Sequence, residues 1–182
     1  RIARLNVDGT LDNSFDVGTG PNKDVKCIVG QPDGRILIGG EFTTWNGVAR
    51  KALVRLHEDG TLDSTLANLD NVVDFFSGFE AVNAIALQPS TTAPFYRILA
   101  GGDFSRPSTG AGFHFGLVAL NPLTGARDTA FDVSYGAHVA GGNSTGNPVA
   151  SLLVQPDGKV VVGGQFGGVH NGTRGRLLPP RP

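Results

Sequence analysis

The stretch QPDGRILIGGEF at residues 31–42 decides the fold, because it recurs twice more along the chain. It returns as QPDGKVVVGGQF at 155–166 and, with five extra residues in its turn, as QPSTTAPFYRILAGGDF at 88–104. The glycine pairs of successive copies are 62 residues apart. Self-similarity at such a period is typical of stacked repeats, and the insertion predicts that this turn is an exposed tip.

A second phrase, RLNVDGTLD at 4–12, recurs as RLHEDGTLD at 55–63 and in degraded form as ALNPLTGARD at 119–128. Within a repeat, apolar runs of five to seven residues alternate with Asp-Gly turns, which is the pattern of short strands joined by hairpins. The best-preserved repeat therefore predicts four strands, at 25–31, 35–42, 52–57 and 61–66.

The Asp-Gly hairpin predicts its own register. A three-residue loop with Gly9 at positive φ places Leu5 opposite Leu11 and Arg4 opposite Asp12. The same loop in the second copy pairs Leu56 with Leu62 and Arg55 with Asp63, so apolar pairs share one face and ion pairs the other. Exposed ion pairs contribute little stability, so we expect both pairs to be structural and neither to be essential.

One segment allows another interpretation. Its apolar residues are spaced four, three, four and three apart, which also suits an amphipathic helix: Leu62, Leu66, Leu69, Val73 and Phe76. Alignment of the repeats favours a strand end followed by a loop insertion.

These features predict an all-β chain of four-stranded, antiparallel, β-propeller-like blades. One repeat domain spans 1–182, with a partial repeat at 1–16, repeats at 25–66 and 82–131, and a partial repeat at 149–178. Twelve or thirteen strands make about three blades, whereas propellers close with about four to eight. We therefore expect the sheet edges to be completed by further protein, either more repeats or copies of the same chain.

The segments RIARLNVDGTLDNSF, VKCIVGQPDGRILIGGEFT and WNGVAR resemble the delta-sixty repeat, a propeller-like repeat of mostly bacterial, often secreted or surface-attached proteins. The resemblance covers nearly the whole chain but weakens at 105–148 and fails at the final LLPPRP. It implies a propeller and an extracellular or cell-surface location. It carries over no catalytic or ligand residues.

Composition excludes several classes of partner. The net charge is −1 and there is no basic run, so neither nucleic acid nor an anionic membrane surface is an expected partner. No apolar stretch approaches the length of a membrane span. The one cysteine, Cys27, lies in an apolar run and is expected to be a buried hydrophobe.

Motifs for chemistry are weak. The four histidines are scattered, at His57, His114, His138 and His170, and no phosphate-binding glycine motif is present, so we expect no catalytic residues and no cofactor. Alternating oxygen side chains from Asn6 to Asp12 raise the question of a calcium loop, but their spacing departs from the EF-hand pattern, and a hairpin turn is favoured over a metal site. A pair of carboxylates acting as in glycosidases remains open, because such pairs converge only in the fold.

The loops after each GGxF phrase, at 43–50, 105–115 and 167–174, would gather on one face of a propeller. They carry aromatic, histidine and amide side chains suited to stacking on sugars or contacting a protein: Trp45, Asn46, Phe113, His114, Phe115, His170 and Asn171. The alternative is that Trp45 and the phenylalanines pack the blade edges. Asn143 and Asn171 match the glycosylation sequon, as chance would also produce.

The sequence thus predicts a non-catalytic scaffold or interaction module outside the cell, with protein as partner and glycan as a second possibility. A carbohydrate-active enzyme or a lectin-like glycan binder on a propeller is the alternative.

Overall fold

The computed structural model describes residues 2–69, 81–91, 94–104, 116–131, 137–138, 149–165 and 168–169 of the chain. Twelve short antiparallel strands lie in these residues, and none of the described residues forms an α-helix. The predicted all-β class is confirmed. Among the described residues, no helix is long and apolar enough to cross a membrane.

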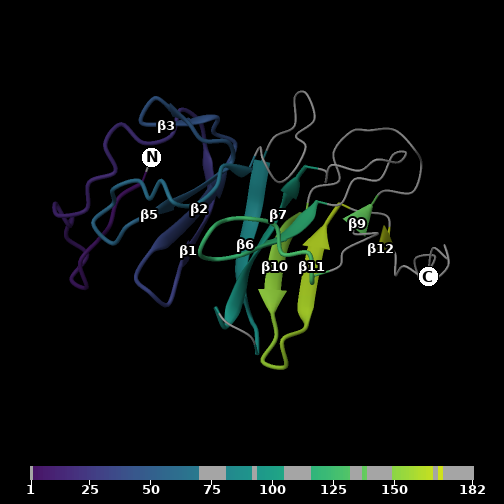
Figure 1. Ribbon diagram of the computed structural model, residues 1–182. Coiled ribbons are helices and arrows are strands. Elements are labelled where there is room, and N and C mark those ends of the chain that lie inside the picture. The colour runs from purple at the N-terminus through teal and green to yellow at the C-terminus, as the bar shows by residue number, and fades with distance from the viewer. Residues whose placement is uncertain are drawn as a thin grey trace.

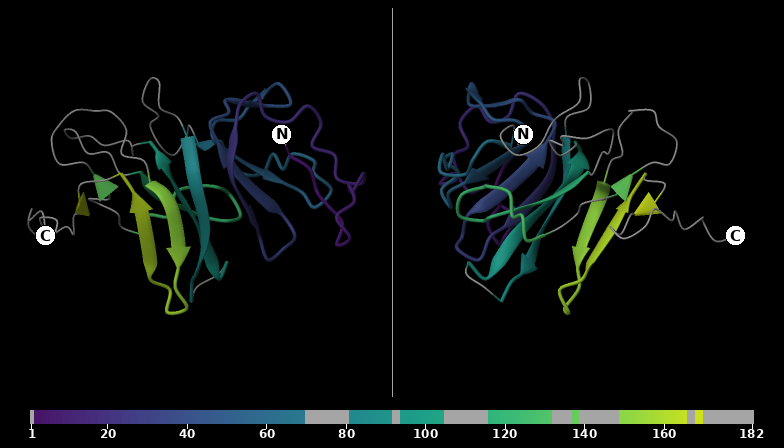
Figure 2. Two further views of the ribbon diagram at one scale, coloured as in Figure 1. Left: turned by 180° about the vertical axis from the view of Figure 1, so that it is seen from behind. Right: turned by 45° about the vertical axis from the view of Figure 1, so that its right-hand side comes forward.

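Three antiparallel sheets follow one another along the chain. They contain β1 (Val25–Gly30), β2 (Ile36–Gly40) and β5 (Leu53–Leu56); β6 (Ala81–Pro89), β7 (Tyr96–Asp103) and β8 (Leu117–Leu120); and β10 (Val149–Val154) with β11 (Val160–Gly164). Figure 1 shows them side by side, coloured from blue to yellow-green, with β6 packed between β1 and β10. Figure 2 shows the same succession from two other sides. We call these sheets blades 1, 2 and 3.

In blades 1 and 2, the first glycine of the Gly-Gly pair makes room for the next blade. A Cβ on Gly39 would lie 2.7 Å from Cγ1 of Val82, and one on Gly101 would lie 2.5 Å from Cγ1 of Val149. The second glycine makes room within the blade, since a Cβ on Gly40 would lie 2.1 Å from the carbonyl oxygen of Asp24, beside the bulge in the β1–β2 ladder. Both positions therefore need glycine because backbone or side chain approaches too closely for any Cβ.

The apolar core is divided among the joints between blades. One cluster joins the faces of blades 1 and 2 and includes Leu37, Leu53, Ile85 and Ile98. A second lies between blades 2 and 3, and a third between blade 1 and residues 2–17. Each blade thus buries its apolar side chains against its neighbours, as repeat units do.

The fourth strand predicted for each repeat is shorter than expected. At 61–66 only the bridge between Leu56 and Leu62 forms, and the first hairpin likewise has only the bridge between Leu5 and Leu11. The carboxylate of Asp63 explains this, because it accepts hydrogen bonds from N and Oγ1 of Thr65 and turns the chain away from the ladder. Leu62 therefore lies in a bridge and Leu66 in a bend. Leu69 has 3₁₀ geometry, and Val73 and Phe76 lie outside the described residues.

Residues 43–50, expected to be a loop, contain a small hairpin of β3 (Thr44–Trp45) and β4 (Val48–Ala49). Asn46 and Gly47 join these strands with φ of 50° and 76°, the tight turn that an Asn-Gly pair favours. The dipeptide was a signal that the sequence interpretation missed. A further short pair joins β9 (Ala137–His138) to β12 (Gly168–Val169).

Candidate functional site

The Asp-Gly turns have the predicted three-residue geometry. In the first hairpin Leu5 lies opposite Leu11, N of Gly9 donates to the carbonyl of Asn6 at 2.9 Å, and φ of Gly9 is 85°. The Asp8 carboxylate accepts hydrogen bonds from N and Oγ1 of Thr10, which lower its pKa. The residues suspected of binding calcium are thus engaged in forming the turn, and the described residues contain no group of three or more metal-ligating side chains.

The second hairpin carries the most buried charges that the structure describes. Nε of Arg55 donates to Oδ2 of Asp63 at 2.7 Å, and each side chain is only 1% exposed. Nε of Arg35, the residue that precedes β2, lies 3.3 Å from the same carboxylate oxygen. Oγ1 of Thr65 accepts from Nη2 of Arg55 at 3.0 Å and donates to Oδ1 of Asp63 at 2.6 Å.

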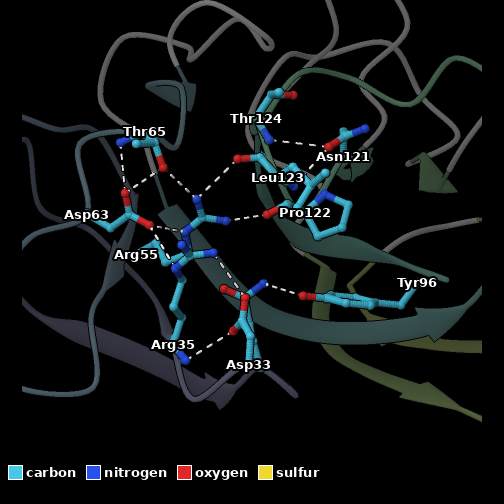
Figure 3. A network of polar contacts seen from close by, with 11 residues as sticks. Asp33, Arg35, Arg55, Asp63, Thr65, Tyr96, Asn121, Pro122, Leu123 and Thr124 are labelled. Carbon is cyan, nitrogen blue, oxygen red and sulfur yellow. Dashed lines mark hydrogen bonds and ion pairs between the residues drawn. The ribbon is translucent and has the colours of Figure 1, made fainter. Parts of the chain in front are cut away.

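Arg55 also reaches the next blade (Figure 3). Its Nη1 donates to the carbonyl of Pro122 and its Nη2 to the carbonyl of Leu123, the latter at 3.2 Å. Beside it, the backbone N of Ala67 donates to the carbonyl of Thr124 at 2.8 Å. The arginine therefore satisfies carbonyls of the blade 2 hairpin while neutralising a carboxylate of blade 1. We call Arg35, Arg55, Asp63 and Thr65 the buried joint.

The buried joint fixes the charge of Asp63. Burial acts to raise the pKa of this carboxyl, but the hydrogen bonds from Thr65 and the Arg55 guanidinium outweigh burial and hold the pKa at about 2. A general acid needs a pKa close to the working pH. Asp63 is therefore a permanent counter-ion at neutral pH rather than a proton donor.

The first hairpin repeats this arrangement in a more open setting. Nε of Arg4 donates to Oδ2 of Asp12 at 2.7 Å, and Nη1 donates to the carbonyl of Glu58 in the blade 1 hairpin at 2.5 Å. The N of Asp16 donates to the carbonyl of Asp59, as that of Ala67 does to Thr124. The two side chains of this pair are 33% and 20% exposed. We call this the open joint.

Both predicted ion pairs are present, but the expectation that both would be exposed is wrong for Arg55 and Asp63. The blade 2 hairpin covers this pair on one side, and blade 1 covers it on the other. The sequence of the hairpin alone does not reveal these neighbours. The degraded third copy has Ala119 at the place of Arg55, and there Nε of Arg97 lies 3.3 Å from Oδ2 of Asp128.

The predicted aromatic loop face is not assembled by the described residues. Trp45 is 0% exposed and packs edge-on against Phe42 with ring centres 5.7 Å apart, so it cannot stack on a ligand. Oδ1 of Asn46 accepts from N of Gly20 at 2.7 Å and so anchors the segment before β1. The remaining five residues lie outside the described residues: Phe113, His114, Phe115, His170 and Asn171.

Two depressions lie beside hairpin tips. One, of about 440 Å³, is lined by Asp33, Arg35, His57, Glu58 and Asp59. The other, of about 300 Å³, lies between the turn that precedes β7 and the chain that follows β8, and its lining includes Tyr96, Arg97, Asn121 and Asp128. In the described part of the chain, the side chain of His57 lies beside carboxylates. His138 lies in β9, and nothing is described of its side chain.

Cys27 lies in the joint between blades 1 and 2. Its Sγ is 3.7 Å from the carbonyl oxygen of Val82, and burial raises the pKa of the thiol to about 11. A thiol with such a pKa carries almost no thiolate at neutral pH. This fits the interpretation of Cys27 as a packing residue.

Stacked antiparallel blades that bury their faces against one another define a β-propeller-like repeat protein. A family model described as a domain of unknown function (DUF5122) beta-propeller matches residues 1–15, 31–66 and 155–178. The matched segments include both intact copies of the Asp-Gly hairpin. The chain is therefore similar to a family of propeller-like repeats. No curated protein and no solved structure gave a match.

Proposed function

We propose that the chain is a non-catalytic β-propeller-like scaffold of the delta-sixty repeat type, acting outside the cell or at its surface as an interaction module. The observation that carries the proposal is that the buried charges hold blades 1 and 2 together. Arg55 and Asp63 are the most buried charged side chains among the described residues, and their polar atoms contact each other, Thr65 and the next blade.

The extracellular location rests on the resemblance to the delta-sixty repeat. Contact with other molecules would use the exposed hairpin tips, where large apolar side chains such as Phe95 and Leu123 are more than half exposed. Singly exposed apolar residues are common on any protein, so the tips support a contact role without identifying a ligand.

The test screens the intact protein for turnover of a panel of glycans and polysaccharides. The expected result is no turnover. The depression beside His57 is the place to check any activity, through Asp33→Asn, His57→Asn and Glu58→Gln. Asp157→Asn is the matched control, because Asp157 has the turn position of Asp33 in blade 3 but lines neither depression. Turnover that one of the first three substitutions abolishes and the control retains would overturn the proposal.

A further inference from the structure

The depression of about 300 Å³ in blade 2 is lined by residues of that blade and its two turns. The depression in blade 1 lies between the corresponding turns, and it is open although the blade 2 hairpin packs against the joint beside it. Such a hollow is therefore a feature of the blade itself. Its volume in blade 2 is at the lower end of the range for small-ligand sites, about 300 to 1,000 Å³.

The two depressions differ in charge. In blade 1, three carboxylates share the lining with one arginine and one histidine. In blade 2, Arg97 and Arg127 line the depression together with Asn121, and among the described residues Asp128 is the one carboxylate of the lining. The blade 2 depression is thus richer in cations and hydrogen-bond donors, which suits an anionic ligand.

Arg97 retains donors for such a ligand. Its Nε lies 3.3 Å from Oδ2 of Asp128, but this buried nitrogen makes no hydrogen bond, and within the described residues neither Nη nitrogen has a hydrogen-bond partner. The arginines of blade 1 are engaged. Nη1 of Arg35 donates to Asp33 at 3.1 Å, and both Nη nitrogens of Arg55 donate to protein oxygens. Two Nη groups of Arg97 are therefore available to an anion in the depression.

Asn121 adds a donor of fixed orientation (Figure 3). Its Oδ1 accepts hydrogen bonds from N of Leu123 at 2.9 Å and from N of Thr124 at 3.3 Å. Because backbone N–H groups can only donate, these bonds identify the oxygen of the amide and leave Nδ2 as its donor end. In the part of the chain that the structure describes, Nδ2 has no hydrogen-bond partner.

The rest of the lining suits a ligand that also carries hydroxyl groups and an apolar ring face. The Asp128 side chain is 25% exposed, and a carboxylate has about four acceptor sites, of which N of Ala130 uses one. Pro94, Tyr96 and Pro122 supply apolar surface. A sugar offers hydroxyls to the carboxylate and C–H groups to the apolar surface, whereas a peptide carboxylate brings no hydroxyl for Asp128.

Both turns beside this depression depart from the repeat. The turn before β7 has five more residues than those of blades 1 and 3, and the turn after β8 makes its hairpin one residue longer than those at 4–12 and 55–63. In the first turn Phe95 is 69% exposed with φ of 68°, a strained conformation for a bulky residue. Insertions in repeat proteins often lie on the binding face, and retained strain gathers at functional sites.

We propose that the blade 2 depression binds a uronic acid residue of an acidic polysaccharide. The sugar carboxylate lies on the Nη groups of Arg97 and on Nδ2 of Asn121, and a sugar hydroxyl donates to Asp128. A planar guanidinium matches a carboxylate because two parallel N–H groups can bind both oxygens. The inference names a ligand class for the interaction module proposed above and rests on that role.

The first test measures binding of galacturonic acid and glucuronic acid trisaccharides to the intact chain by isothermal titration calorimetry at neutral pH. The matched ligands are their methyl esters, which keep the rings and hydroxyls but carry no charge. We expect at least one acid to bind and its ester to bind about tenfold more weakly or less, because hydrogen bonds to charged groups are the stronger ones. No binding of either acid, or equal binding of acid and ester, would overturn the proposal. So would tighter binding of a tri-glutamate peptide.

The second test places the sugar in the depression. Asn121→Asp keeps the Oδ1 acceptor that the turn uses but replaces Nδ2 with a carboxylate oxygen, so it should abolish binding. Asn6→Asp is the matched control, because Asn6 has the same position in the first hairpin, and it should bind as the unaltered chain does. An Asn121→Asp chain that binds the acid with unchanged affinity would overturn the site.

The third test removes the cation. Arg97→Gln should weaken binding about tenfold or more, whereas Arg50→Gln, which removes the same charge from a residue outside both depressions, should not. Circular dichroism checks the fold of each variant, and Asn121→Asp decides the matter if Arg97→Gln does not fold. Equal affinities of the two arginine variants would overturn the proposal.

Mass spectrometry of the recovered trisaccharides separates this inference from the function on which it rests. Intact sugar that bound through Arg97 and Asn121 supports both. Cleaved sugar would overturn the non-catalytic role, whereas intact sugar that never bound would overturn the uronic acid site alone.

Discussion

Residues 4–12 and 55–63 have nearly the same sequence and form the same hairpin, yet one joint is open and the other is buried. Their local hydrogen bonds match, from the Asp-Gly turn to the Arg–Asp bond of 2.7 Å. What differs is their surroundings: Asp63 has a second cation, Arg35, and Arg55 contacts two carbonyls of the next blade. The same short sequence therefore forms an exposed ion pair that contributes little stability in one place. In the other it forms a buried ion pair whose disruption is costly.

The largest difference between the joints should come from removing the arginines. We expect Arg55→Met to lower the free energy of unfolding by about 3 to 5 kcal/mol, because Asp63 would keep its charge in a buried site with only Arg35 nearby. Arg4→Met removes the same bond from the open joint. Urea unfolding measures the loss in free energy of unfolding for each variant. Equal losses in the two variants would contradict the distinction between the joints.

The two turn glycines provide a second contrast. Gly9 and Gly60 both have positive φ, but a Cβ on Gly60 would lie 2.8 Å from the carbonyl oxygen of Asp16, whereas one on Gly9 would meet nothing within 4 Å. Both alanine variants carry the backbone strain, and only Gly60→Ala adds overpacking, which typically costs about 1 to 3 kcal/mol. Thermal unfolding of the pair isolates that packing cost. If Gly9→Ala is the more damaging, the close approach of Asp16 to Gly60 at the open joint is not what constrains this turn.

Acid should weaken the buried joint in a defined pH range. The pKa of Asp63 is about 2 in the folded chain and 3.8 without its partners. Its stabilising contribution is therefore complete above the unfolded value and is lost as the pH falls through the folded one, a loss of about 2 kcal/mol. Urea unfolding between pH 5 and 2 should show this loss in the unaltered chain and a flatter profile in Asp63→Asn. Asp12→Asn serves as the control and should retain most of the pH dependence.

The smallest effect is expected at the open joint itself. Hydrogen bonds from Ser14 and then Arg4 lower the pKa of Asp12, but both partners of the ion pair reach solvent. Salt screens such exposed pairs more than buried ones. The small loss caused by Arg4→Met should therefore shrink further in 1 M salt, while the loss caused by Arg55→Met should persist. A salt-independent loss in Arg4→Met would mean that its contact with Glu58, rather than charge, dominates.

The candidate site was only partly predictable. The ion pairs followed from hairpin register, because Arg and Asp flank a turn whose length the glycine fixes. The contacts of Arg55 with Pro122 and Leu123 did not follow, since they join residues more than sixty positions apart whose spacing depends on loop insertions. For Trp45 the sequence left two interpretations, a ligand-binding loop face and packing at the blade edge, and the structure shows packing, with the ring buried against Phe42.

The sequence by itself determined the local geometry: short strands, Asp-Gly turns with positive φ and the cross-strand register. These depend on backbone sterics and on residues within a few positions of one another. Only the tertiary structure decided which copies of a motif are buried. Burial depends on whether a neighbouring blade covers the hairpin, and for Arg55 that is a property of the stack rather than of the phrase in which the residue lies.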